Sequence, residues 1–175
     1  MTDHFTECLV KKIPDSSDNL KKFLIILAAV VFAAGTIFIS FATHFYLILI
    51  ITIALFYGLY YFIKGMSIEY EYTFTNGELD IDKIMGQRKR QHLITVEAEK
   101  FEAFDKMSGD VPEKPNATLF LCSDNTGEGE YYADLTTEEY GETRIIFTPT
   151  EKMVSYIEDS LSPILKYHKR QKNID

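Results

Sequence analysis

The segment from Phe23 to Ile63 contains no Lys, Arg, Asp or Glu, and this limits what the chain can fold into. It divides into two apolar runs, residues 23–41 and 45–63. Each run has close to the roughly 20 residues that a helix needs to cross the core of a bilayer. Only residues 42–44 separate the runs, so the two helices must run antiparallel. We therefore predict a hairpin of two transmembrane helices.

Three other interpretations of this segment fail. One continuous helix through both runs would be about 60 Å long, twice the thickness of the bilayer core. A signal peptide would begin closer to the first residue and would not lead directly into a second apolar span. A soluble core helix is normally shorter than either run and carries polar residues on one face.

The lysines give the hairpin a direction. Positively charged loops stay on the cytoplasmic side of a membrane. The tip of the hairpin has no Lys or Arg, whereas its two inner flanks carry Lys11, Lys12, Lys21, Lys22 and Lys64. We therefore expect a multi-pass protein of the cell membrane with both termini in the cytoplasm. Aromatic residues prefer the two membrane interfaces, and they gather near the ends of the second run: Phe45, Tyr46, Tyr57, Tyr60 and Tyr61.

Small residues occur four apart in both spans. Ala29 and Ala33 form one pair, and Ala54 and Gly58 form the other. Such pairs let two helices approach closely, so they are candidate helix–helix contacts, either within the hairpin or between copies or subunits. Neither span contains an ionisable residue other than tyrosine, which argues against an ion path or proton relay. The hairpin is therefore predicted to be an anchor.

The rest of the chain has the composition of a soluble, acidic domain. Residues 66–175 contain 13 Lys and Arg against 22 Asp and Glu, a net charge of −9. A domain of this charge gains nothing from counterion release, so nucleic acid is an unlikely partner on physical grounds. The two cysteines, Cys8 and Cys122, lack metal-site and disulfide-framework spacing, which indicates ordinary thiols in a reducing compartment. Residues 1–22 are predicted to be a cytoplasmic N-terminal lead.

Beyond Met66 the apolar pattern changes from helical to alternating. Apolar and polar residues alternate in residues 67–75, Asn76-Gly77 is a strong hairpin signal, and residues 78–84 alternate again. Further segments of the same kind, broken by Gly- and Pro-containing loops, bring the predicted strands to seven: residues 67–75, 78–84, 87–96, 100–106, 117–122, 130–135 and 143–147. We expect these strands to be antiparallel.

A single amphipathic helix is predicted to follow the strands. Thr148 is the expected cap, Pro149 suits the first helical position, and Glu151 completes a capping box. Pro163 should kink or end the regular helix. Residues 169–175 are then a tail. The apolar stripe lies at helical spacing on Met153, Val154, Ile157, Leu161, Ile164 and Leu165.

The expected fold is therefore a membrane α-helical hairpin plus an α+β soluble domain. Seven antiparallel strands would form a bent sheet or partly open barrel, and the C-terminal helix would cap it. This order, over about residues 67–168, resembles the bacterial pleckstrin-homology-like fold. The cues are the strand count, the Asn76-Gly77 turn and the helix after Thr148-Pro149.

The whole chain also resembles a domain-of-unknown-function family of small two-helix membrane proteins of Gram-positive anaerobic bacteria. The residues that carry this resemblance are the ECLVKK run (Glu7–Lys12), the hairpin, and the stretch Glu69–Ile84. That family has no assigned activity, so the resemblance supplies no mechanism.

A search for catalytic and metal motifs finds no acid–base pair that the pattern supports. The four histidines, His4, His44, His92 and His168, are far apart, and there is no phosphate-binding glycine loop or nucleophile elbow. The turn Asp124–Gly129 has a leucine where a calcium loop needs its twelfth ligand, Leu135. Cys122 should point away from Leu119 and Leu121 and has no matched base. We therefore predict no enzyme, no cofactor and no metal.

Arg88, Lys89 and Arg90 form the one dense basic run of the soluble domain. In the pleckstrin-like fold that the chain resembles, basic residues near the early strands can bind phosphorylated lipids. Two other roles stay open: these charges could protect a strand edge from pairing, or pair with Asp80 and Asp82 on the neighbouring strand.

Three functional hypotheses follow. The first is a membrane-anchored, non-enzymatic interaction or scaffold module that binds an unknown protein through a sheet edge or groove. The second is a domain that senses anionic lipid headgroups at the inner membrane surface. The third is an accessory subunit of a larger membrane complex or a homo-oligomer, with Ala29, Ala33, Ala54 and Gly58 as its helix contacts.

Overall fold

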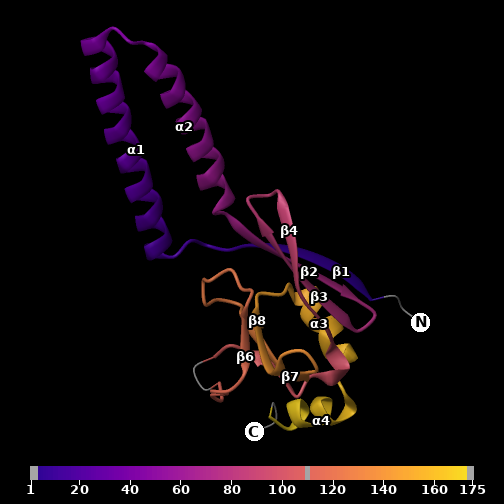
Figure 1. The fold of residues 1–175 in the computed structure, drawn as a ribbon. Helices are drawn as coiled ribbons and strands as arrows, with labels where there is room; N and C mark the ends of the chain where they lie inside the picture. Colours follow the sequence, from indigo (N-terminus) through magenta and orange to yellow (C-terminus); the bar gives the residue numbers. More distant parts are fainter. Residues whose placement is uncertain (1–3, 109–110, 173–175) are drawn as a thin grey trace. The chain divides into compact units, whose positions relative to one another are not determined.

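The computed structural model describes residues 4–108 and 111–172, which form two compact units (Figure 1). Of the described residues, one unit holds His4–Ile13, Glu69–Ile84 and those from Lys89 onward. The other unit holds Pro14–Ile68 and Met85–Arg88. The N-terminal residues thus belong with the soluble domain, and the helices are inserted into it in sequence.

The helical unit consists of α1 (Ser16–Thr43) and α2 (Leu47–Gly65), which lie antiparallel and side by side (Figure 1). The most apolar windows of these helices have mean hydropathies of 2.7 and 2.0, and only 6% of the residues in each window are buried. A soluble core helix would be mostly buried, so two exposed apolar helices of this length fit a membrane hairpin. The tip is His44–Tyr46, two residues later than predicted.

Both helices satisfy their polar groups locally. The Asp15 carboxylate accepts a hydrogen bond from the Ser16 amide at the start of α1, and His44 ends α1 in the left-handed conformation with φ 56°. Within the helices, the Thr36 and Thr52 hydroxyls donate to the carbonyls of Ala33 and Ile48. Hydroxyl groups that bond to their own helix carry little cost in an apolar surrounding.

The first sheet contains a strand that the sequence analysis missed. Its order is β1 (Phe5–Lys11), β2 (Ile68–Thr75), β3 (Glu78–Met85) and β4 (Lys89–Glu97). β1 pairs antiparallel with β2, from Phe5 opposite Thr75 to Lys11 opposite Glu69. The prediction that residues 1–22 are a lead was therefore wrong for β1. Its alternation is weak because Thr6 and Cys8 occupy inward positions.

The second sheet has the order β5 (Ala103–Lys106), β7 (Tyr131–Thr137), β8 (Gly141–Phe147) and β6 (Thr118–Leu121). β5 and β8 both run antiparallel to β7, whereas β6 runs parallel to β8. A short 3₁₀ helix, η1 (Ala98–Lys100), precedes β5. The described residues thus form eight strands in two unclosed sheets, where seven antiparallel strands in one bent sheet or partly open barrel were expected.

Two C-terminal helices complete the domain. α3 (Glu151–Ser160) contacts β1 and η1, and α4 (Pro163–Lys172) follows it. α3 ends at Ser160, shortly before Pro163, in line with the predicted end of the regular helix. Pro163 then begins a second helix, where a single one was expected. The cap is Thr150 instead of Thr148, because the Thr150 hydroxyl accepts from the Met153 amide at 3.3 Å. α4 also extends into the predicted tail.

The core of the domain lies between the two sheets and α3. Its largest fully buried side chains come from all three parts: Tyr72, Phe74, Leu79, Ile81, Phe104, Leu135, Ile145, Phe147, Met153 and Ile157. The rings of Tyr72 and Phe147 meet edge to face across the core, with centroids 5.6 Å apart. This packing holds the two sheets together as one domain.

Candidate functional site

The basic run at Arg88–Arg90 is divided between two surroundings. The turn Met85–Arg88 lies against the end of α2, within the helical unit. The Gly86 amide donates to the Ser67 carbonyl at 2.7 Å, and the Arg88 guanidinium lies 3.6 Å from the centre of the Tyr61 ring. This arrangement puts Arg88 beside the aromatic C-terminal end of α2.

Glycine is required in this turn. Gly86 has a φ of +58°, and a Cβ at that position would lie 2.8 Å from the Gly65 Cα and 3.0 Å from the Lys64 carbonyl oxygen. Real Cβ atoms do not approach backbone so closely, and the left-handed conformation adds strain. The close approach of the turn to α2 therefore depends on Gly86.

Arg90 pairs with carboxylates of the first sheet. It forms an ion pair with Glu71 on β2, and its Nε lies 3.4 Å from Asp82 on β3. His92 lies 2.9 Å from the same Asp82 carboxylate. Pairing with Asp82 was one of the roles considered for this run, and Arg90 adopts it. Lys89 is exposed at the start of β4, the outer strand of this sheet.

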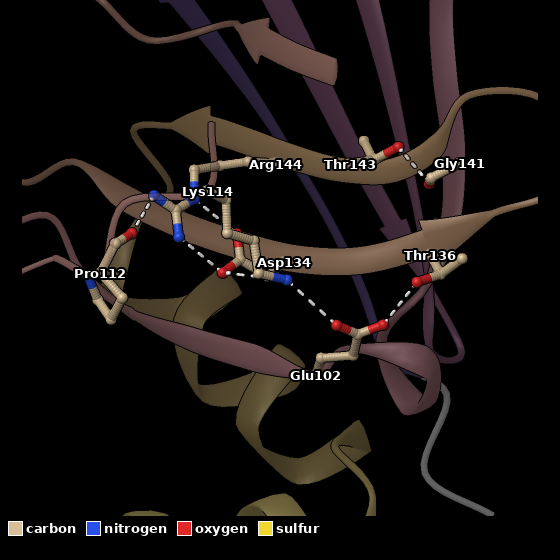
Figure 2. Close-up of polar contacts among 8 residues, drawn as sticks. All are labelled: Glu102, Pro112, Lys114, Asp134, Thr136, Gly141, Thr143 and Arg144. Atoms are coloured by element: carbon tan, nitrogen blue, oxygen red, sulfur yellow. Dashed lines mark hydrogen bonds and ion pairs between the residues drawn. The ribbon is translucent and has the colours of Figure 1, made fainter. Parts of the chain in front are cut away.

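A buried charged cluster lies on the second sheet (Figure 2). Arg144 on β8 and Asp134 on β7 are cross-strand partners, and their side chains are only 10% and 4% exposed. Two parallel hydrogen bonds join them, at 2.6 Å from Nε and 2.8 Å from an Nη. The other Nη donates to the Pro112 carbonyl at 2.8 Å. Hydrogen bonding to Asp134 raises the pKa of Arg144, so the guanidinium stays charged.

The cluster continues to the surface through Glu102 (Figure 2). The Lys114 ammonium lies 3.2 Å from the Glu102 carboxylate and 3.7 Å from that of Asp134, and Thr136 donates to Glu102 at 2.7 Å. The Thr136 hydroxyl is the main cause of a lowered pKa at Glu102, and Lys114 adds to it. Every charge in this cluster has an opposite partner, so its arrangement is that of a structural clamp between β7, β8 and the segment before β6.

This cluster was absent from the sequence analysis, although a signal was available. Asp134 and Arg144 are the charged residues inside two otherwise apolar strand segments, and any hairpin that joins those segments places them near each other. A charge at a position whose neighbours are buried usually has a buried partner.

Cys122 is an inert thiol in this fold. It is buried on the face opposite the exposed Leu119 and Leu121, as expected from the alternation. Burial raises its pKa to about 12, so the thiol stays protonated at neutral pH. The Tyr72 hydroxyl donates to the Cys122 carbonyl at 2.5 Å, and burial raises the pKa of Tyr72 as well.

The four small residues of the hairpin lie in different surroundings. Ala29 and Ala33 are half-buried, at the helical spacing that continues to the buried Ser40. Ala54 and Gly58 are exposed, and a Cβ on Gly58 would meet nothing within 4 Å. The structure therefore separates the two pairs: the first is partly covered within the hairpin, and the second lies on an open face of α2.

Within residues 4–108 and 111–172, no group of three or more His, Cys, Asp or Glu side chains is arranged to hold a metal ion. The histidines remain apart in this part of the chain: His4 stacks on Tyr156 and His92 bonds to Asp82.

Two unclosed sheets followed by C-terminal helices are the arrangement of a pleckstrin-homology-like domain. The chain belongs to the family described as Bacterial PH-like domain (DUF6106), which matches residues 2–164. The match includes β1 and the hairpin, so the inserted helices are part of the family's pattern. Neither the curated proteins nor the solved structures contain a significant match to this chain.

Proposed function

We propose that this protein is a membrane-anchored, non-enzymatic interaction module that presents its PH-like domain to a protein partner at the cytoplasmic membrane surface. The observation that carries the proposal is the pairing of β1 with β2 across the inserted hairpin. The chain leaves the domain after β1, passes through two apolar helices and returns directly into β2.

Two short connections would restrain the domain at the membrane. Only Lys12–Asp15 separate β1 from α1, and only Met66 and Ser67 separate α2 from β2. Because β1 and β2 are paired, both ends of the hairpin must lie on one side of the bilayer. The flanking lysines favour the cytoplasm for that side. A domain held by two such connections loses less orientational freedom on binding than one on a single flexible linker.

Crosslinking in native membranes tests this function. The full chain should resist extraction by carbonate and high salt, dissolve in detergent, and carry a crosslinked protein other than itself. A matched variant with the surface change Lys152→Gln should retain the same partner. Release by carbonate would contradict the anchor, and recovery of the chain alone, or of lipid alone, would contradict the interaction module.

A second candidate, binding of anionic lipid headgroups, is favoured by the position of Arg88. The turn that ends at Arg88 approaches Lys64 and Tyr61 at the end of α2, where a membrane helix would meet the headgroups, and Lys89 follows Arg88 in sequence. Each cation near an anionic leaflet contributes about 1 kcal/mol. Arg90 is excluded from this set because its guanidinium is paired with Glu71 and Asp82.

A photoreactive anionic lipid in nanodiscs distinguishes the two candidates. Under the lipid hypothesis, Arg88→Gln with Lys89→Gln lowers crosslinking of the full chain several-fold, whereas the charge-matched pair Lys106→Gln with Lys152→Gln leaves it unchanged. Equal crosslinking of both double variants would end the lipid hypothesis.

A further inference from the structure

The outer strand of the first sheet borders a groove. β4 is hydrogen-bonded to β3 on one side, and in the described residues no strand pairs with its other side. A hollow of about 550 Å³ lies there, lined by His92–Thr95 of β4 and by Thr137–Tyr140 of the β7–β8 turn. A free strand edge beside such a hollow is able to receive another extended segment.

The hollow continues along β4 toward the Asn76-Gly77 turn. A second hollow of about 320 Å³ shares Thr95, Thr137 and Glu138 with the first. A third of about 460 Å³ shares Glu78 and Glu97 with the second. The three hollows thus adjoin one another beside the second half of β4, and we refer to them together as the groove. From His92 to Glu97 it offers about 20 Å of strand, at roughly 3.3 Å per residue.

The walls of this groove are strongly acidic, and their carboxylates are exposed: Glu78, Glu97, Glu99, Glu138 and Glu139. Among the described residues, Lys100 is the only Lys or Arg that lines it, and its ammonium is bonded to Glu97 at 2.8 Å. The groove therefore keeps a large excess of negative charge. Acidic walls repel nucleic acid and anionic lipid and attract cationic segments.

We propose that this groove, beside the free edge of β4, binds an extended Lys- and Arg-rich segment of a protein partner by strand addition. The backbone of the segment would pair with residues 92–97, and its cationic side chains would face Glu138, Glu139 and Glu97. This inference rests on the proposed function, because it names the surface and the partner chemistry of the interaction module. It differs from the lipid hypothesis in both location and charge.

Binding of a defined peptide to the full chain in phosphatidylcholine nanodiscs tests the inference. The probe is a fluorescent eight-residue peptide of alternating lysine and valine, measured by anisotropy. It should bind, whereas the same peptide with glutamate for lysine, or with two central prolines, should bind at least tenfold more weakly. Proline removes the amide donors that strand addition needs. A benzophenone on the peptide should crosslink within residues 92–97 or 137–140.

Charge reversal in the groove provides the matched comparison. Glu138→Lys with Glu139→Lys should weaken peptide binding at least tenfold. The binding that remains should be less sensitive to added salt than binding to the unchanged chain. Glu113→Lys with Glu128→Lys changes the net charge equally at exposed positions outside the groove and should alter binding less than threefold. Circular dichroism of each variant shows whether the fold is retained.

Equal losses for the two double variants, full binding of the proline peptide, or crosslinks elsewhere would overturn the inference. Absence of peptide binding would also overturn it. In that case a protein partner recovered by crosslinking in native membranes would leave the proposed function intact, so the two failures are distinguishable. Calcium should displace the peptide no better than another salt at the same ionic strength. Saturable calcium binding that depends on Glu138 would instead assign the groove to a cation and overturn the inference.

Discussion

Replacing Arg144 by methionine should greatly destabilise the soluble domain. The change removes both hydrogen bonds to Asp134 and the bond to the Pro112 carbonyl. It leaves a carboxylate that is 4% exposed, with Lys114 at 3.7 Å as its remaining cation. Breaking a buried ion pair by removing one partner costs about 3–5 kcal/mol. That is a large part of the roughly 5–15 kcal/mol that stabilises a typical domain.

Pulse proteolysis of the full chain in nanodiscs, across a urea series, measures this loss. With a slope of about 2 kcal/mol per molar urea, the midpoint should fall by about 2 M. Lys100→Met is the control: its side chain is 62% exposed and that of its partner Glu97 is 55% exposed, so its loss should barely move the midpoint. Combining Asp134→Leu with Arg144→Met should recover part of the loss, since no unpaired charge stays buried.

Similar midpoints for Arg144→Met and Lys100→Met would refute the reasoning. A loss in free energy of unfolding below about 1 kcal/mol for Arg144→Met would also refute it, because burying a carboxylate that has lost its guanidinium partner should cost more than that.

Three further predictions concern single positions. Gly86→Ala should destabilise the Met85–Arg88 turn by more than about 1 kcal/mol, measured as faster hydrogen exchange in that turn. The control is Gly127→Ala: a Cβ there meets no atom within 4 Å, so the change should cost only the strain of its positive φ. Thr150→Ala should cost about 1 kcal/mol in a urea titration, and Thr150→Ser should restore most of it. In a Cys8→Ser background, Cys122 should react with a thiol reagent at pH 8 only on unfolding. Because its folded pKa is raised to about 12, its contribution to stability is full below pH 8 and declines from pH 9 to 12, by at most about 1.4 kcal/mol per pH unit.

The two long apolar helices could be predicted from the sequence because their signal is local and long. A charge-free run of two membrane lengths admits few other structures, and their bounds moved by only a few residues except at the start of α1. There the polar first two turns, Ser16–Lys22, continue the helix beyond the apolar run. Apolar length locates the span, whereas the cap at Asp15 locates the helix end.

β1 could not be predicted in the same way. Its partner β2 lies beyond both membrane helices, so no turn signal joins the two strands. Its inward residues include Thr6 and Cys8, which weaken the apolar alternation. The parallel direction of β6 relative to β8 could not be predicted either, because a short apolar run does not indicate which strand it pairs with or in which direction.

The candidate sites show the same limit. The run Arg88–Arg90 was visible as a charge pattern, but its division between the α2 end and the first sheet depends on the Gly86 turn. The groove beside β4 needs the approach of the β7–β8 turn, which is a tertiary contact. Local pattern located the charges, and only the fold determined which of them have partners.

Labelling of single cysteines by a membrane-impermeant maleimide in intact and permeabilised cells tests the central claim most directly. Phe5→Cys in β1, His44→Cys at the hairpin tip and Asn125→Cys in the domain are all exposed positions. In a background without Cys8 and Cys122, the tip should be labelled in intact cells, whereas the other two should be labelled only after permeabilisation. Labelling of Phe5→Cys and Asn125→Cys from opposite sides, or of all three from one side, would contradict a membrane hairpin inserted between paired strands.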